Sequence, residues 1–170
     1  MLSADQYPLL QYRAFIAKHI SPRFAFGYGL TYSNFTYTAL QVTRNNAANT
    51  AALPPDASAS KIPPQGGWDS LYDTICTVSI TLTNSGRVPA AEVAQLYVGI
   101  PGSGQPKVLR GFEKQLIQPG ESASVSFPLR RRDLSIWDTR SQQWRLPSGA
   151  FAVYVGKSVL DIQLQGSLQL

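Results

Sequence analysis

The sequence predicts an all-β protein, a β-sandwich of about seven to eight short strands. Three observations support this fold class. Apolar and hydroxylated residues alternate along several segments, as expected of strands with one buried face. Gly, Pro and Asn interrupt the chain at short intervals, where turns are expected. No segment has the roughly 3.6-residue period of an amphipathic helix, so we expect no substantial helix.

The two clearest strands are Cys76–Thr83 and Ser122–Leu129. In the first, the even positions are apolar and the odd positions carry hydroxyl groups, which places Cys76 on the core side. It ends at Asn84-Ser85-Gly86, whose residue types favour a turn. The second strand alternates serine with apolar residues in the same way. Because Pro128 has no N–H to donate to a neighbouring strand, we expect this strand to lie at a sheet edge.

Six further strands are assigned by the same reasoning, the first three on stronger patterns than the others. They are Glu92–Val98, Phe151–Val155, Leu160–Leu164, Phe35–Thr43, Arg110–Ile117 and Gln143–Leu146. The Glu92–Val98 segment is rich in strand-forming residues, but its pattern does not indicate which face is buried. With the two clear strands, this assignment fits one sandwich domain, the size expected of 170 residues.

A long loop is predicted at about residues 44–70, where the pattern changes to Asn, Ala, Ser and Pro. Loops of this length are uncommon inside compact domains. The favoured interpretation is a mobile surface insertion, and the alternative is a loop that touches a neighbouring domain or a ligand. Within it, Trp68 is flanked by Gly66-Gly67 and Asp69. Trp68 is either a lid over the end of the sandwich, which we favour, or an exposed contact for carbohydrate or another surface.

Charge and hydropathy exclude several classes of partner. The net charge of +5 is modest, and its only local run, Arg130–Arg132, is followed at once by Asp133. A nucleic-acid-binding protein usually gathers such an excess into a stripe, so we expect no nucleic-acid partner. We favour ion pairing within the domain for this run over a basic binding patch. No apolar stretch approaches the roughly 18 residues of a membrane span, so we expect no membrane association.

The residues also argue against catalysis and cofactor binding. Glycoside hydrolysis commonly needs two carboxyl groups about 5–10 Å apart. Glu92, Glu113 and Glu121 each resemble a solvated charge at a strand end or turn, and Asp133 and Asp138 are better explained as caps or ion-pair partners. The single histidine and the single cysteine cannot supply clustered metal ligands or an internal disulfide. We therefore predict no catalytic residue, no metal site and no cofactor.

Aromatic residues are concentrated near the N-terminus. They are Tyr12, Phe15, Phe24, Phe26, Tyr28, Tyr32, Phe35 and Tyr37. One interpretation is a platform on which sugar rings stack. The favoured interpretation is a hydrophobic seam for domain packing, with Tyr12, Phe15, Phe24, Phe26 and Tyr28 as its residues. Beside them, Asn34-Phe35-Thr36 forms an N-glycosylation sequon, so Asn34 is a candidate glycosylation site.

Taken together, the motifs resemble a known domain. The segment Pro22–Tyr32, which reads PRFAFGYGLTY, is similar to the FxFGxGLSYxxF signature of family 3 glycoside hydrolases, the β-glucosidase family. There it leads into a C-terminal fibronectin type III-like domain. Further similar motifs follow in the same order: Asn84–Gly86, Ala91–Val98, Leu109–Lys114, Pro119–Glu121, Arg131–Asp138 and Pro147–Gly149. The resemblance covers about Tyr12–Leu170 and is closer to the fungal branch than to the bacterial one.

The resemblance implies a fibronectin type III-like, immunoglobulin-like sandwich at residues 21–170. Residues 1–20 would be a connector remnant from a preceding α/β domain, with Gln11 where the family usually has Asp. The family's nucleophile and acid/base lie in two other domains, so the isolated chain is expected to be inactive although its parent would be a retaining β-glucosidase.

We therefore expect a non-catalytic accessory domain that packs against the catalytic domains of a parent enzyme and stabilises them. The alternative is a stand-alone module that binds polysaccharide, lignin or a cell wall. The N-terminal residues contain no secretion signal, so an extracellular location is expected only if the chain is part of a secreted parent.

Overall fold

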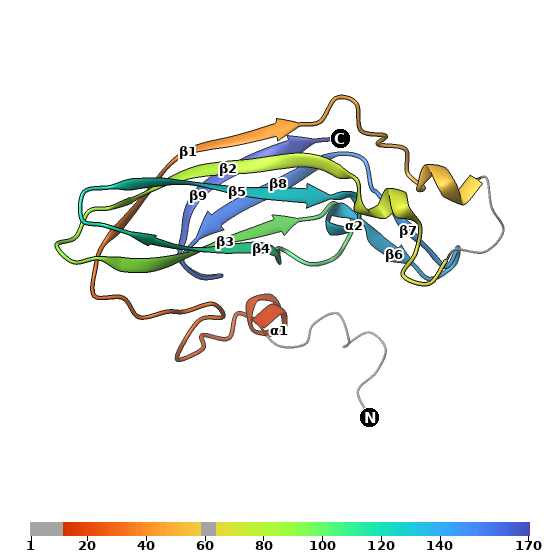
Figure 1. Ribbon diagram of the computed structural model, residues 1–170. Helices are drawn as coiled ribbons and strands as arrows, with labels where there is room; N and C mark the ends of the chain where they lie inside the picture. The colour runs from red at the N-terminus through yellow and green to blue at the C-terminus, as the bar shows by residue number, and fades with distance from the viewer. Residues whose placement is uncertain (1–11, 59–63) are drawn as a thin grey trace.

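A computed structural model, which describes residues 12–58 and 64–170, contains two antiparallel sheets packed face to face. One sheet has the order β1-β2-β5 and the other the order β4-β3-β8-β9 (Figure 1). The strands of the first are β1 (Phe35–Arg44), β2 (Thr74–Asn84) and β5 (Ser122–Arg130). Those of the second are β4 (Val108–Ile117), β3 (Ala90–Gly99), β8 (Ala150–Gly156) and β9 (Ile162–Gln169). The predicted β-sandwich is confirmed.

Several short elements lie outside the two sheets. They are α1 (Tyr12–Ala17), η2 (Pro55–Ser58), η3 (Asp69–Tyr72), α2 (Arg131–Leu134) and the hairpin β6 (Ile136–Asp138) and β7 (Gln143–Arg145). The helices have 6 residues or fewer, so no helical period develops, and the sequence pattern did not reveal them. The hairpin closes the end of the sandwich at which β5 finishes (Figure 1).

The core fills the space between the sheets, as the alternation predicted. Val78, Ile80 and Leu82 of β2 are at most 1% exposed, and Phe127 of β5 and Phe151 of β8 close the same space from other strands. The thiol of Cys76 is also buried there, as predicted. Strand β5 lies at the edge of its sheet, as Pro128 predicted.

Strand β3 is buried on both faces, which explains why its sequence did not indicate a core side. Leu96 and Val98 point into the sandwich, whereas Gln95 and Tyr97 are buried beneath the segment at residues 12–34. Glu92 lies on the inner side and is 6% exposed, so the expectation of a solvated charge was wrong. Its carboxylate accepts a hydrogen bond of 2.8 Å from the Tyr37 hydroxyl of the opposite sheet.

The loop between β1 and β2 is partly fixed to the sandwich. The guanidinium of Arg131, which is 1% exposed, donates to the main-chain carbonyls of Ala51, at 2.8 Å, and Asn49. The N–H of Leu146 donates to the carbonyl of Ala52 at 2.8 Å. These contacts join this part of the loop to the sandwich, and residues 59–63 lie outside the described residues.

Candidate functional site: an aromatic docking surface

Residues 12–34, here called the N-terminal segment, run along the outer face of the sheet that contains β3 and β4 (Figure 1). Hydrogen bonds between distant parts of the chain fix the segment there. The N–H of Leu109 donates to the Tyr12 hydroxyl at 3.0 Å, and the N–H of Val159 donates to the Phe26 carbonyl at 3.0 Å. The amide of Gln95 donates to the Gly27 carbonyl at 2.8 Å. The segment is therefore an ordered layer of the domain.

The inner side of the segment is aromatic and packs on β3. The ring of Tyr12 stacks on that of Phe26 with their centroids 4.2 Å apart, and its edge meets Tyr97 at 6.5 Å. Tyr97 is fully buried, and this burial raises the pKa of its hydroxyl above the ordinary range. The Tyr97 hydroxyl donates to Gln95 Oε1 at 2.6 Å. Gln95 thus joins β3 to the segment, a role that the sequence pattern did not indicate.

A tight approach of the backbone explains one glycine of the segment. Gly27 has φ of +81°, and a Cβ at this position would lie 1.9 Å from Gln95 Oε1. Another residue would clash with the amide that holds the segment, in addition to adopting a left-handed conformation. The glycine within the FxFGxG pattern is therefore required by packing of the segment on β3.

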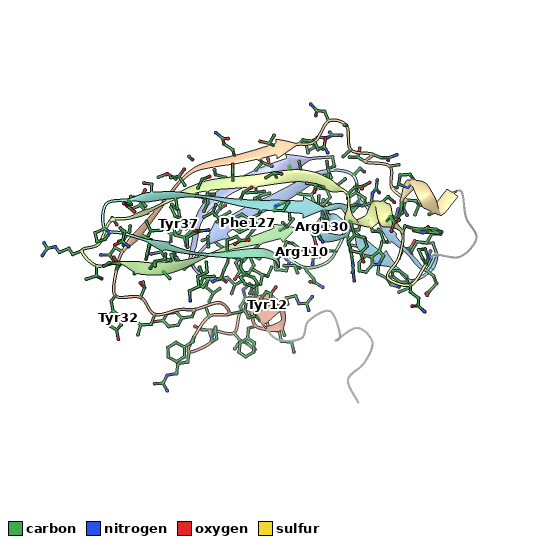
Figure 2. The ribbon with its side chains drawn as sticks, viewed as in Figure 1. Tyr12, Tyr32, Tyr37, Arg110, Phe127 and Arg130 are labelled. Carbon is green, nitrogen blue, oxygen red and sulfur yellow. The ribbon has the colours of Figure 1, made fainter. Side chains whose placement is uncertain are left out.

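The outer side of the segment exposes large apolar side chains. Phe15, Phe24 and Tyr28 are 41%, 61% and 55% exposed, and the rings of Phe24 and Tyr28 lie 5.2 Å apart. With Ile20, Leu30 and Tyr32 they form what we call the outer aromatic patch. Figure 2 shows Tyr12 close to the sheet and Tyr32 at the far end of the segment. The aromatic residues predicted to form a single seam thus include a pair held against the sheet, Tyr12 and Phe26, of which Phe26 is still 38% exposed, and a more exposed set.

A groove of about 560 Å³ opens beside the outer aromatic patch. It lies between α1, the chain at residues 20–26 and the turn at Val159–Leu160. Most of its lining side chains are apolar, and His19 contributes a polar group. The groove and the patch together make a concave and largely apolar surface, which is suited to contact with another folded surface.

The other predicted contact residues lie elsewhere. Asn34 is exposed immediately before β1, and its carbonyl accepts a hydrogen bond of 2.8 Å from the Ser85 N–H. Trp68 is half-buried at the opposite end of the sandwich, beside η3 and the β6–β7 hairpin. Tyr12, Phe15, Phe24 and Phe26 therefore line one groove, Tyr28 contacts Phe24 beside it, and Trp68 lies in a separate pocket.

Among the side chains that the structure describes, the acidic residues do not form a recognisable hydrolytic site. Burial raises the pKa of Glu92, but the carboxylate is hydrogen-bonded to Tyr37 inside the sandwich. Glu113 and Glu121 are exposed, as predicted. Asp133 Oδ2 accepts from the Arg130 N–H at 2.9 Å, and Asp138 accepts from the Arg140 N–H at 3.0 Å, which confirms both as local caps. Among residues 12–58 and 64–170, no group of three His, Cys, Asp or Glu side chains is placed to hold a metal.

The described part of the chain also contains no helix that is both long and apolar enough to cross a bilayer. The short helices of the domain lie at its surface or between strands, and the longest has 6 residues.

Comparisons with known proteins agree with this architecture. The sequence profile of the fibronectin type III-like domain matches residues 92–159. A probable β-glucosidase M from Aspergillus niger is 47% identical over 161 residues, which are 95% of this chain and 20% of that protein. The structure of β-glucosidase D2-BGL from Chaetomella raphigera superimposes with a TM-score of 0.86 at 46% identity, covering 98% of this chain and 23% of that one.

A family 3 β-glucosidase from Neurospora crassa superimposes with a TM-score of 0.80 at 27% identity, covering 92% of this chain and 27% of that one. The chain thus spans about a fifth of the length of the curated relatives that it matches, for example 20% of the A. niger protein and 22% of a β-glucosidase L from Aspergillus fumigatus. The resemblance to the fungal branch is confirmed by these relatives. The chain is similar to fibronectin type III-like domains at residues 92–159 and, over more than nine-tenths of its length, to a part of fungal β-glucosidases that include a family 3 enzyme.

Proposed function

We propose that the chain is a non-catalytic accessory domain, which packs against the catalytic domains of a family 3 β-glucosidase through its outer aromatic patch and stabilises them. The observation that carries this proposal is the division of the N-terminal segment. Its inner aromatic residues are fixed to the sheet, while Phe24 and Tyr28 are more than half exposed. The hydrolysis of β-glucosides would be the activity of the parent enzyme and not of this chain.

The order of the segment makes it suited to docking. Because the hydrogen bonds from Leu109 and Val159 already hold the segment in place, little conformational entropy would be lost when a second domain covers it. Aromatic side chains contribute strongly to the buried centre of protein interfaces. An exposed apolar patch beside an apolar groove of about 560 Å³ also has the composition expected of such a centre.

A chimaeric enzyme tests the docking role. The matching region of the A. niger β-glucosidase M, which is 47% identical, is replaced by this chain, with or without the pair Phe24→Ser and Tyr28→Ser. We expect the pair to shorten the half-life of thermal inactivation at least about fivefold, which corresponds to a loss of roughly 1 kcal/mol of interface contact. Val88→Ser, at an exposed apolar residue on the β2–β3 turn, is the matched control.

The free chain supplies the second control. Both substituted side chains are exposed, so the pair should change the free energy of unfolding of the isolated domain by less than about 0.5 kcal/mol. An equal half-life for the wild-type and doubly substituted chimaeras would contradict the docking role.

A direct assay tests the absence of catalysis. The purified chain should release no p-nitrophenol from p-nitrophenyl β-glucoside, because Glu113 and Glu121 are exposed and the carboxyl group of Glu92 is hydrogen-bonded to Tyr37 inside the sandwich. Turnover that persists after further purification and is lost on substitution of one of these three glutamates would overturn the proposal.

Secretion and glycosylation form a separate part of the proposal. We propose an extracellular location as part of a secreted parent, with a glycan on Asn34, whose position just before β1 is exposed. Expression behind a secretion signal in a fungal host should yield a chain that shifts in mass on treatment with an endoglycosidase. The Asn34→Gln variant should not shift, and a wild-type chain without any shift would exclude the glycan.

A further inference from the structure

The three tryptophans of the chain meet at one end of the sandwich. Trp137 of β6 and Trp144 of β7 are a cross-strand pair, with ring centroids 5.5 Å apart in an edge-to-face arrangement. Trp68 approaches from the loop before η3, and the three side chains line a pocket of about 450 Å³. Trp137 is 45% exposed, so part of this aromatic surface is open to solvent. Sequence reasoning singled out Trp68 and did not identify the other two.

A second pocket of about 330 Å³ adjoins the first, and Trp144 lines both. Its charged lining consists of Arg110, Arg130, Arg132 and Asp133, so cations outnumber anions by three to one. The guanidinium of Arg132 lies 5.2 Å from the centroid of the Trp144 ring. Figure 2 shows Arg110 and Arg130 near the same end of the sandwich, where β4 begins and β5 ends. The two pockets therefore place aromatic rings next to positive charge.

Each pocket is lined by a residue that has a buried polar atom without a hydrogen-bond partner. Gln143 lines the tryptophan pocket, and its Oε1 is a buried acceptor with no hydrogen bond. Arg110 lines the arginine pocket, and its Nε is a buried donor with no hydrogen bond. Buried polar atoms are usually satisfied, and leaving one unsatisfied is costly.

We propose that the tryptophan pocket and the arginine pocket form one binding site for an oligosaccharide that carries a carboxylate group. The apolar face of a pyranose ring would lie on Trp68 and Trp137, with its hydroxyl groups toward the polar side chains that line the same pocket. The carboxylate would be bound by the guanidinium groups of Arg110 and Arg130. The proposal is independent of the outer aromatic patch, because Trp68 and the patch are on separate surfaces.

The chemistry of the lining favours this class of ligand over others. A planar guanidinium matches a carboxylate through two parallel hydrogen bonds, which a neutral sugar cannot accept in the same way. Hydroxyl and amide groups at Ser141, Gln142 and Gln143 surround the tryptophans, as expected of a site that recognises a polyol. Nucleic acid would need a longer run of cations, and Asp133 interrupts the cationic lining.

Calorimetric titration of the full chain tests the proposal. The probes are xylotetraose and the same tetrasaccharide substituted with one glucuronic acid. We expect the acidic oligosaccharide to bind about tenfold more tightly than the neutral one, since a charged arginine–carboxylate contact is one of the stronger polar interactions. Phe112→Ala and Arg87→Gln are the matched controls, because both residues are exposed and outside the two pockets, and neither should change either affinity.

Two substitutions separate the parts of the site. Trp137→Ala should weaken binding of both oligosaccharides at least about tenfold, and Arg130→Gln should remove the preference for the acidic one while binding of the neutral one remains. If Trp137→Ala melts at a much lower temperature than the wild type, Trp137→Phe replaces it as a smaller change. No binding of either oligosaccharide at millimolar concentration would overturn the proposal.

The remaining outcomes also decide between ligand classes. Equal affinity for the acidic and neutral oligosaccharides would refute the arginine pocket as a carboxylate site. Binding of a single-stranded oligonucleotide that equals the acidic oligosaccharide and is unaffected by Trp137→Ala would show a general polyanion surface and overturn the proposal. Because these titrations use the free chain, their failure would leave the chimaera test of docking unaffected.

Discussion

Removal of the Asn84 side chain should be among the most destabilising single changes in this domain. Asn84 is fully buried, and its side chain makes four hydrogen bonds. Its Oδ1 accepts from Ser33 Oγ at 2.6 Å and from the Gly86 N–H at 3.0 Å. Its Nδ2 donates to the carbonyls of Val88 and Ile117, each at 2.9 Å. One amide thus joins the N-terminal segment, the turn between β2 and β3, and the end of β4.

The expected loss follows from the number of bonds. At about 1 kcal/mol for each hydrogen bond, Asn84→Ala should lower the free energy of unfolding by about 4 kcal/mol, a large share of the roughly 5–15 kcal/mol typical of a domain. For a chain of this size the melting temperature should fall by about 10 °C. Urea titration followed by tryptophan fluorescence measures the change, since all three tryptophans lie at the other end of the sandwich and report global unfolding. A loss below about 1 kcal/mol would refute the reasoning.

Two further variants identify the cause. Ser33→Ala removes only the bond to Oδ1, so its loss should be near 1 kcal/mol. Asn84→Asp keeps the acceptor but removes both donors and buries a carboxylate. At pH 7 it should therefore be at least as destabilising as Asn84→Ala, with partial recovery near pH 4, where the carboxyl becomes protonated and can donate one hydrogen bond. Equal stability of the aspartate variant at both pH values would contradict this explanation.

Three other predictions concern buried groups. Burial raises the pKa of Glu92, so its contribution to stability is present at low pH and is lost as the pH rises through the raised pKa. In urea titrations, Glu92→Gln should therefore gain stability relative to the wild type between pH 4 and pH 7. Parallel pH profiles of the two proteins would contradict this. Arg131→Met should lower the free energy of unfolding by about 3 kcal/mol. It should also speed thermolysin cleavage near Asn49, because the Asn49 carbonyl loses its hydrogen-bond donor. Unchanged cleavage would count against the role of Arg131 in holding this loop. Burial raises the pKa of the Cys76 thiol to about 11, so a disulfide reagent at pH 8 should label it only after unfolding, and rapid native labelling would show an open core.

The sandwich could be predicted because its core strands each bury one face. Strands β2 and β5 alternate between apolar and hydroxylated residues, and their register places Val78 opposite Phe127 across one ladder. Strand β3 was assigned without a core side, since the N-terminal segment covers its outer face and both faces became buried. The hairpin of β6 and β7 was predicted only in part, because each of its strands has 3 residues and shows no period.

The polar interior could not be predicted from pattern alone. Glu92 and Asn84 are of residue types that are usually exposed, and each is buried because a partner distant in sequence satisfies it, 55 and 51 positions away for Tyr37 and Ser33. Of the two candidate sites, one could be found from local sequence and the other depends on the fold. Local aromatic density identified the N-terminal segment, whereas the approach of Trp144 to Trp68 depends on the path of the loop before η3.

The stacking of Tyr12 on Phe26 and against Tyr97 also affects where this unit can be divided from its neighbours. A cut after residue 20 would remove Tyr12 and Arg13, together with their hydrogen bonds to Leu109 and Gln105. The rings of Phe26 and Tyr97 would then be exposed to solvent, and the shortened fragment would tend to self-associate through them. The smallest fragment that keeps these rings covered therefore retains the α1 helix. A folding unit of this domain would begin at or before α1, and not at the first strand, β1.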